Sequence, residues 1–347
     1  MQYNLLMQKC IEIAKKGEGL TSPNPLVGCV VLDKDGNEIS NGYHQKYGEN
    51  HAERDALLKL HNGEEKGGTL IVNLEPCSHF GKTPPCADLI IERGLKRVVI
   101  GMHDVNPIVA GNGIKKLQDA GIEVIENVLE QECKVLNEVF IKNMTKKEVF
   151  VAIKTATTLD GKIAAHNGSS KWITSEKARE EVKKIRNRYD AIMTTSSTII
   201  ADNPAMMHRK KIILDRKLKT NLEAPVYKNG EIYLFNGTLD MFEGGINFIK
   251  TPVKDEKLDL EFVLKKAYEL GIKSILVESG GHLNGEILKY TDKIYHFIAP
   301  KITGDNSSLS CFDFRQIDNI NDSFNFKIIQ TDIFEPDILL TYYPISK

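Results

Sequence analysis

Short apolar runs alternate with helix-like segments along this chain, and this alternation limits its possible folds more than any other feature. In the first half, helix-like segments separate the strand-like runs, which are residues 25–33, 69–74 and 97–102. Residues 35–40, DGNEIS, are typical of a hairpin turn into a further strand. Strands separated by helices usually pair in parallel through helical crossovers. The pattern predicts an α/β layered domain with a largely parallel sheet.

A second series of strands and helices begins after a charged segment near the middle of the chain. Residues 133–148, CKVLNEVFIKNMTKKE, predict a closing helix and a charged linker. We therefore place a boundary near residue 146, which gives one domain over residues 1–146 and a second over residues 147–347. A chain of 347 residues accommodates two domains of ordinary size.

Composition excludes several classes of protein. A net charge of -1 gives no general attraction to nucleic acid or to an anionic membrane. Six cysteines are few for a disulfide scaffold and fit a reducing compartment. Residues 1–16 mix lysines and a glutamate with apolar residues, which is typical of an amphipathic helix and not of a signal peptide. We expect a soluble cytoplasmic protein.

The stretch HAERDALL predicts a helix that begins at His51, with Asn50 as its N-cap. The first turn of a helix is a favourable place for a metal or an anion. An ordinary capped helix with a surface histidine would have the same sequence, so this stretch alone decides nothing.

Downstream, Cys77 and Cys86 flank a loop with two prolines, and Cys86 opens a helix. One imidazole and two thiolates with water as the fourth ligand form an open zinc site of the catalytic type. Two alternatives remain at this stage. The three residues could be buried thiols and a surface imidazole, or His79 could complete a structural site as a fourth ligand.

Glu53 favours the catalytic interpretation. If the metal lies off the end of the helix, His51 can bind it while Glu53 reaches the substrate beside it, takes a proton from water and delivers it to a leaving amine. The pattern H-x-E followed by P-C and a second cysteine is that of zinc nucleobase deaminases. Here eight residues separate the cysteines instead of two, so the simplest form of the pattern is not matched.

The second half has no G-x-G-x-x-G fingerprint, so a Rossmann dinucleotide site finds no support. Residues 275–288 run from a strand through Gly280 and Gly281 into a helix, which allows close approach of a phosphate. Residues 193–204 place serine and threonine hydroxyls after another strand, where they are also suited to binding a phosphate. Each feature alone is more often an ordinary turn or loop.

The motifs TSPNPLVGCVV, HAE, EPCSHFGKTPPC and DVNPIVAGNG together resemble the deaminase half of the bifunctional riboflavin-biosynthesis deaminase/reductases. The resemblance implies a cytidine-deaminase-like three-layer fold, zinc on His51, Cys77 and Cys86, and Glu53 as the proton shuttle. It also implies six substrate contacts, for each of which a turn or a cap is the competing role: Asn24, His44, His79, Lys82, Asp104 and Asn106.

The motifs KTATTLDGKIA, SSKWITS, ILDRKLKT and LVESGGHLNGEIL resemble the reductase half of the same family, with a dihydrofolate-reductase-like fold that uses NADPH. The implied cofactor contacts are Ala156, Trp172, Thr198, Asp202, Gly280, Gly281, His282, Leu283, Asn284 and Gly285. The implied substrate contacts are Lys154, Ser170, Arg186, Met206, Arg209 and Glu278. For Trp172 the alternative is simple packing, and for Arg186 it is a solvated helix face.

One departure from the family concerns the segment after residue 202. Met206 and Met207 stand where the family has a leucine-threonine pair, and the longer loop that usually follows is almost absent. Arg209 could therefore simply begin the next strand, and the reductase could be impaired or differently specific.

The resemblance implies a bifunctional enzyme of riboflavin biosynthesis. It would remove the 2-amino group of 2,5-diamino-6-(5-phosphoribosylamino)pyrimidin-4(3H)-one and then reduce the ribosyl group with NADPH. We expect Zn²⁺ and NADPH as cofactors, a small pyrimidine ribose-phosphate as substrate, no nucleic acid or membrane partner, and a homo-oligomer. The alternatives are a zinc deaminase of another base with an inactive or differently specific second domain, and a zinc-stabilised binding protein without activity.

Overall fold

The computed structural model of the chain describes residues 2–79, 84–106, 111–313 and 315–345. The chain divides into two compact units, Met1–Lys147 and Glu148–Lys347. Each unit has a sheet and a hydrophobic core of its own. Within the described ranges, none of the helices combines the length and the hydropathy that a membrane span requires.

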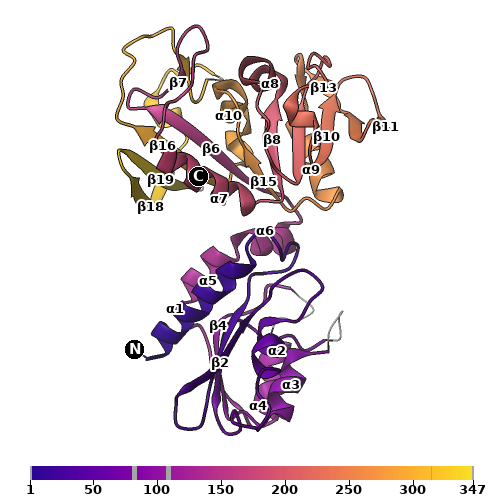
Figure 1. The fold of residues 1–347 in the computed structure, drawn as a ribbon, viewed down its shortest axis with the longest axis vertical. Coiled ribbons are helices and arrows are strands. Elements are labelled where there is room, and N and C mark those ends of the chain that lie inside the picture. Colours follow the sequence, from indigo (N-terminus) through magenta and orange to yellow (C-terminus); the bar gives the residue numbers. More distant parts are fainter. Residues whose placement is uncertain (1, 80–83, 107–110, 314, 346–347) are drawn as a thin grey trace. The chain divides into compact units, whose positions relative to one another are not determined.

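The first unit is a five-stranded sheet between two layers of helices. Its strands, in the order β2-β1-β3-β4-β5, are β1 Gly28–Leu32, β2 Glu38–Tyr43, β3 Thr69–Leu74, β4 Arg97–Met102 and β5 Glu123–Ile125. Its helices are α1 Gln2–Ala14, α2 Ala52–Leu57, α3 Cys86–Glu92, α4 Asn112–Asp119, α5 Glu130–Leu136 and α6 Glu138–Lys146, with a short 3-10 turn at Lys15–Gly17. Figure 1 shows α1 and α5 on one side of this sheet and α2, α3 and α4 on the other, so the three-layer prediction is confirmed.

Four of the five strands of this sheet run in the same direction, as expected, and β1 is the exception. Strand β1 runs antiparallel to both of its neighbours, β2 and β3, while the pairs β3–β4 and β4–β5 are parallel. The reason is the hairpin between β1 and β2, which reverses the chain direction and places β1 between β2 and β3 in the sheet. The crossover through α2 then joins β2 to β3, and these two strands run in the same direction on either side of β1.

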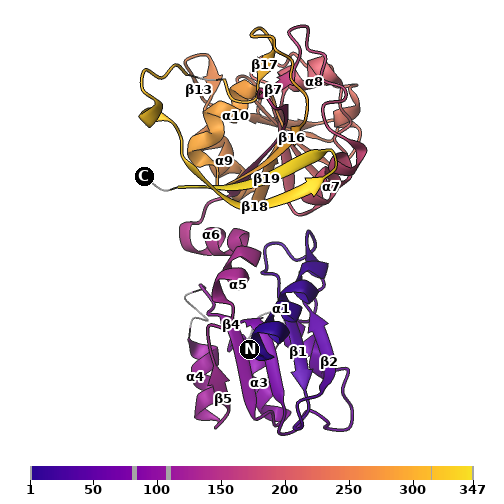
Figure 2. The same ribbon diagram turned by 90° about the vertical axis from the view of Figure 1, so that its left-hand side faces the viewer.

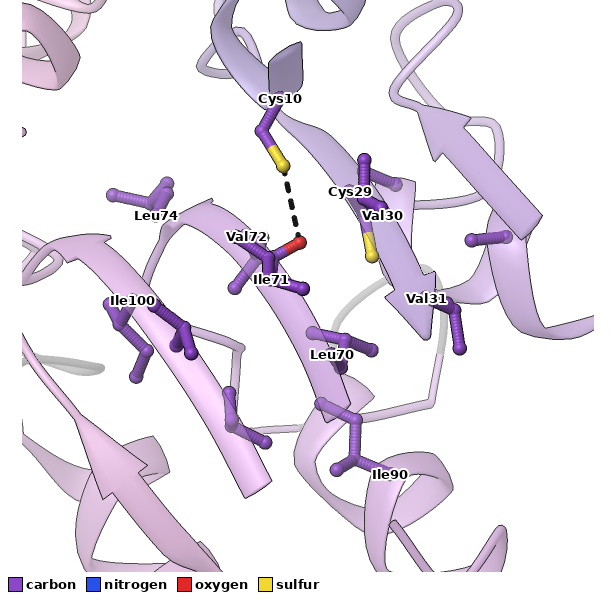
Figure 3. Packing of buried hydrophobic residues seen from close by; sticks show 14 of the residues in the cluster. Cys10, Cys29, Val30, Val31, Leu70, Ile71, Val72, Leu74, Ile90 and Ile100 are labelled. Carbon is purple, nitrogen blue, oxygen red and sulfur yellow. Dashed lines mark hydrogen bonds between the residues drawn. The ribbon is translucent and has the colours of Figure 1, made fainter. Parts of the chain in front are cut away.

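Strands β1 and β3 are buried on both faces, which explains their nearly continuous apolar sequences. Helix α1 lies so close to β1 that a Cβ atom at Gly28 would come within 2.1 Å of the Cys10 carbonyl oxygen. Figure 3 shows this part of the core, where the Cys10 thiol donates a hydrogen bond to the Ile71 carbonyl at 3.4 Å. The close contact fixes α1 against the central strands.

Two local predictions in this unit are wrong. Helix α2 begins at Ala52 with His51 as its N-cap, so Asn50 is not the cap. The Asn50 carbonyl instead lies 2.9 Å from Nδ1 of His44. The expected single closing helix is two helices, because Asn137 between them turns its side chain to Leu26, accepting from its N–H at 2.8 Å and donating to its carbonyl at 3.0 Å.

The second unit contains a ten-stranded sheet in the order β11-β12-β10-β9-β8-β15-β6-β16-β19-β18. These strands are β6 Phe150–Thr158, β8 Ala191–Thr195, β9 Lys210–Leu214, β10 Glu231–Asn236, β11 Met241–Glu243, β12 Ile246–Lys250, β15 Ser274–Val277, β16 Lys293–Ala299, β18 Phe326–Phe334 and β19 Asp337–Pro344. The seven strands from β12 to β16 in this order are parallel, and β11, β19 and β18 are antiparallel to their neighbours.

Helices cover both faces of this sheet. They are α7 Glu176–Asn187, α8 Ser196–Asp202, α9 Leu260–Glu269 and α10 Gly281–Ile287, with 3-10 turns at Pro225–Tyr227, Leu288–Tyr290 and Ile320–Asp322. Figure 2 shows α9 and α10 on one side and α7 and α8 on the other. Two small ladders pair β7 Lys162–Ala164 with β17 Leu309–Ser310 and β13 Val253–Lys254 with β14 Lys257–Leu258.

Strand order in the second unit identifies the place for a ligand. After β6 the chain builds β8, β9, β10 and β12 outward and then returns to insert β15 between β6 and β8. Open α/β sheets bind their ligands beyond the carboxyl ends of the strands where the strand order reverses. The carboxyl ends of β6, β8 and β15 meet at such a point.

Candidate active sites

Three potential metal ligands of the first unit lie together. Nδ1 of His51 is 3.5 Å from Sγ of Cys77 and 3.5 Å from Sγ of Cys86, and all three ligand atoms lie within 4.8 Å of one another. His51 caps α2, Cys86 is the first residue of α3, and Cys77 follows the end of β3. Two helix starts and a strand end thus converge on one point.

These distances fit zinc. With Zn–S distances of about 2.3 Å and a Zn–N distance of about 2.0–2.1 Å, tetrahedral coordination separates the nitrogen from each sulfur by about 3.5 Å. Hydrogen bonds with Cys86 and His51 lower the pKa of the Cys77 thiol, against the opposing effect of burial. A thiolate is the form that binds a metal.

Within the described ranges, no fourth protein ligand accompanies these three, so the fourth coordination position is open. Among the residues that the structure describes, the metal-binding group consists of His51, Cys77 and Cys86 alone. His79, the alternative fourth ligand, is exposed and lies outside this group. Three protein ligands with an open position are typical of catalytic zinc, whereas structural zinc is enclosed by four.

Glu53 lies beside this group and is buried, with 3% of its surface exposed. Because His51 is the N-cap with extended backbone, the two side chains need not share a helix face to reach one site. Burial raises the pKa of Glu53 to about 7, although the nearby His51 favours the ionised form. A carboxyl group whose pKa lies near neutrality can both accept and donate a proton.

A cavity of about 280 Å³ is lined by His51, Cys77 and Glu53 among other residues. Five of the six substrate residues expected in this unit line it: Asn24, His44, His79, Asp104 and Asn106. The sixth, Lys82, lies outside the described residues. The structure therefore brings together residues from four separate stretches of sequence.

Burial raises the pKa of Asp104 to about 6, with the nearby Glu75 carboxylate acting in the same direction.

His44 and Asn24 form a pair within the wall of this cavity. The Asn50 carbonyl can only accept, so Nδ1 of His44 carries the proton, and Nε2 is left to accept from the Asn24 amide at 3.1 Å. Burial lowers the pKa of His44 and favours this neutral form. Asn24 also makes the expected turn, since its N–H donates to the Thr21 carbonyl at 2.8 Å.

Sequence reasoning missed several residues that also line the cavity, among them Tyr47, Glu49, Glu75 and Phe140. Phe140 comes from α6, nearly ninety residues after His51 along the chain, so no local pattern indicates it. Glu75 was visible as the residue that precedes Pro76 and Cys77, but nothing in the sequence shows what its side chain contacts.

In the second unit, Lys154, Arg186 and Glu278 meet as an ion-pair group. Arg186 binds Glu278 through both carboxylate oxygens, at 2.5 and 2.9 Å, and Nζ of Lys154 lies 3.5 Å from Oε2. Burial alone would raise the pKa of Glu278, but Lys154 and Arg186 more than offset it and lower the pKa to about 2. Arg186 therefore does not belong to a solvated helix face.

Four of the expected cofactor residues lie at or near the carboxyl ends of β6, β8 and β15 in the chain. Ala156 lies on β6, Thr198 lies in α8 directly after β8, and Gly280 and Gly281 join β15 to α10. Within α10, Leu283 is buried in the core, and the buried Asn284 bonds through its side chain to Ser279 and to the Cys311 carbonyl. His282 and Gly285 are also on this helix, exposed and buried respectively.

Of the remaining predicted residues of this unit, Asp202 is the last residue of α8 and the others lie on loops. The Ser170 hydroxyl donates to Asp202 at 3.4 Å. Trp172 is 64% exposed, so it is not a core residue, and the Arg179 guanidinium lies 4.4 Å from its ring centroid. Met206 is buried in an apolar cluster, and Arg209 is exposed one residue before β9.

Two family models match separate parts of the chain. Residues 1–102 match the family model described as "Cytidine and deoxycytidylate deaminase zinc-binding region", and residues 149–340 match the "RibD C-terminal domain". The chain is 39% identical over 359 residues to riboflavin biosynthesis protein RibD of Actinobacillus pleuropneumoniae, covering 98% of this chain and 95% of that protein. It is 40% identical to RibD of Aquifex aeolicus over 90% of this chain and 91% of the relative.

Solved structures agree with these matches. The chain is similar to a diaminohydroxyphosphoribosylaminopyrimidine deaminase/5-amino-6-(5-phosphoribosylamino)uracil reductase of Thermotoga maritima, with a TM-score of 0.90, 40% identity and coverage of 99% of both chains. It is also similar to RibD of Acinetobacter baumannii, with a TM-score of 0.87, 32% identity and 99% coverage of both chains.

Proposed function

This chain belongs to the RibD family of bifunctional riboflavin-biosynthesis enzymes, and from that premise we propose which of its residues perform each reaction. The enzyme deaminates 2,5-diamino-6-(5-phosphoribosylamino)pyrimidin-4(3H)-one and reduces the product to 5-amino-6-(5-phosphoribitylamino)uracil. It uses Zn²⁺ for the first reaction and NADPH for the second. Residues up to 146 form the deaminase domain, and residues from 147 onward form the reductase domain.

In the deaminase domain, His51, Cys77 and Cys86 would hold the zinc. A zinc ion in such an open site lowers the pKa of its water ligand to near neutrality. Glu53 takes a proton from the attacking water and delivers it to the amino nitrogen, so that the carbon gains oxygen and ammonia leaves. Asn24, His44, His79, Lys82, Asp104 and Asn106 bind and orient the substrate. The observation that carries this assignment is the 3.5 Å separation of His51 Nδ1 from each sulfur, beside the buried Glu53.

In the reductase domain, bound NADPH would supply the hydride that C1 of the ribosyl group needs, and a proton from solvent would complete the ribitylamino product. The protein orients the two reactants and excludes water. The turn and helix that begin at Gly280, together with Ala156, Trp172, Thr198 and Asp202, bind the cofactor. Lys154, Ser170, Arg186, Met206, Arg209 and Glu278 face the substrate. The shortened segment before β9 is the part of this site that departs most from the family.

A paired assay tests both assignments. The zinc-loaded protein is incubated with the diaminopyrimidine ribonucleotide, first without and then with NADPH, and ammonia, NADPH oxidation and product mass are measured. We expect one ammonia per substrate in the first reaction and two added hydrogens in the second. Absence of ammonia would overturn the deaminase assignment, and absence of NADPH oxidation on the deaminated product would overturn the reductase assignment.

We further propose a homo-oligomer in the cytoplasm. Strand β18 is the outermost strand of its sheet, and its Ile328 and Ile333 are 54% and 71% exposed. Exposed apolar edge strands favour association. All six cysteines are free, which suits a reducing compartment. Light scattering of the purified chain tests the first point, because a monomeric mass at micromolar concentration would contradict it.

A further inference from the structure

Glu75 follows the last residue of β3 and is 3% exposed. Its own N–H donates to the Met102 carbonyl at 3.0 Å and so continues the pairing of β3 with β4. Burial of a carboxylate without hydrogen-bond partners would cost much free energy of folding. The partners of this carboxylate therefore indicate its structural role. Its side chain accepts hydrogen bonds from four backbone N–H groups.

Both carboxylate oxygens accept two such bonds each. Oε2 accepts from the N–H of Asp104 at 3.2 Å and of Gly111 at 3.1 Å, and Oε1 accepts from Gly113 at 3.0 Å and Ile114 at 3.4 Å. Gly111 is the N-cap of α4, and it has no side chain to bond the free N–H groups of the first turn. Glu75 supplies those acceptors from another element.

The same carboxylate joins two parts of the deaminase site. Cys77 lies two residues after Glu75, and Asp104 and Asn106 line the cavity. The Asp104 side chain in turn accepts from the Asn106 N–H at 2.8 Å. Helix α4 lies close to the segment between Glu75 and Cys77, since a Cβ atom on Gly113 would come within 2.0 Å of the Pro76 carbonyl oxygen.

We propose that Glu75 is a positioning residue for deamination, which holds the cavity wall formed by Asp104 and Asn106 at a fixed distance from the zinc ligand Cys77. The inference rests on the proposed deaminase function. A glutamine at this position could accept through one oxygen only. Its amide group would face two N–H donors at the other position, so one pair of backbone groups would lose its acceptor.

The test is steady-state deamination by zinc-loaded Glu75→Gln in the full-length chain. We expect the KM for the diaminopyrimidine ribonucleotide to rise about tenfold, with kcat changed much less and zinc retained. The reason is that Asp104 and Asn106 would be displaced from the bound substrate, whereas the zinc ligands and Glu53 would stay in place. Removal of a negative charge alone would lower the KM for a phosphorylated substrate, so a rise reports geometry. The matched control is Glu65→Gln. Glu65 is another buried glutamate of the same unit, and it pairs with Arg93 at 2.7 Å, so we expect its substitution to leave the KM unchanged.

A double-mutant cycle with Asn106→Ala separates positioning from general stability. If Glu75 acts through this wall, Glu75→Gln raises KM much less in the Asn106→Ala background than in the wild type. An unchanged KM, a loss of kcat alone, a loss of zinc or fully additive effects would each overturn the proposal. An inactive wild type would overturn the deaminase function as well, so the two failures are distinguishable.

Discussion

Glu53 is the residue on which the proposed deamination depends most directly. Glu53→Gln keeps the shape of the side chain, but an amide cannot accept a proton and return it. We expect ammonia release to fall by a factor of about 10²–10⁴, the usual contribution of a general acid–base group, while zinc content stays near one per chain. Ammonia assays and metal analysis on the same preparation check this. Near-normal ammonia release from the zinc-loaded variant would refute the assigned role.

The cysteines provide a second test at the scale of single residues. Cys77→Ser or Cys86→Ser should lose zinc and deamination together, because the hydroxyl is a much weaker ligand than a thiolate. Cys10→Ser is the matched control: it is buried in the same unit, and a serine there can keep the hydrogen bond to the Ile71 carbonyl. Zinc retained by both site variants, measured by metal analysis, would exclude these cysteines as ligands.

How far single residues could be predicted depends on how local their signal is. His51, Glu53, Cys77 and Cys86 stand in short motifs whose chemistry is legible along the sequence, and the structure brings them to one place. The contacts of Glu75 were not predictable, since its partners are backbone groups 29 to 39 residues later. Almost every residue has a backbone N–H group, so the residue types of these partners do not indicate the hydrogen bonds.

At the scale of elements, the ion-pair group joins β6, α7 and the end of β15, and it predicts a dependence of stability on pH. The pKa of Glu278 is about 2 in the folded chain against an ordinary value of 4.5. Its ion pairs therefore stabilise the fold above about pH 5, and this contribution is lost as the pH falls toward 2. At about 1.4 kcal/mol per pKa unit, the loss amounts to roughly 3 kcal/mol.

Glu278→Gln should remove this part of the acid sensitivity. The free energy of unfolding of the second unit, measured in urea between pH 7 and pH 3, is expected to fall less steeply in the variant than in the wild type. The variant is also expected to be less stable at pH 7, because Arg186 and Lys154 lose their carboxylate. Glu261→Gln, on the exposed side of α9, is the control and should keep the wild-type slope. Equal slopes for Glu278→Gln and wild type would contradict the assignment.

Elements were easier to predict than their arrangement. The apolar runs at residues 69–74 and 97–102 are β3 and β4 with the predicted limits, because strands buried on both faces need continuous apolar sequence. The hairpin between β1 and β2 was predictable from residues 35–40, but the pairing of β1 with β3 and the break at Asn137 were not. Both depend on partners distant in sequence, β3 for the strand and Leu26 for the asparagine.

For the whole molecule, the two compact units predict that metal removal acts on one unit alone. The first unit has its own core, and the proposed zinc ligands His51, Cys77 and Cys86 all come from it. Zinc at a hundred times its dissociation constant would stabilise this unit by about 2.7 kcal/mol, which corresponds to a melting shift of roughly 5–10 °C for a unit of this size. The second unit, with separate cores, should not respond.

Calorimetry and a reductase assay on chelated protein measure this independence. After zinc is removed with a chelator, we expect ammonia release to stop and one unfolding transition to shift downward, while NADPH oxidation with the deaminated substrate continues at its original rate. Added Zn²⁺ should restore both properties, whereas Mg²⁺ should restore neither, because thiolate and imidazole ligands select zinc over magnesium. A single transition that moves as a whole, or a reductase lost together with the metal, would mean that the two units are not independent in stability.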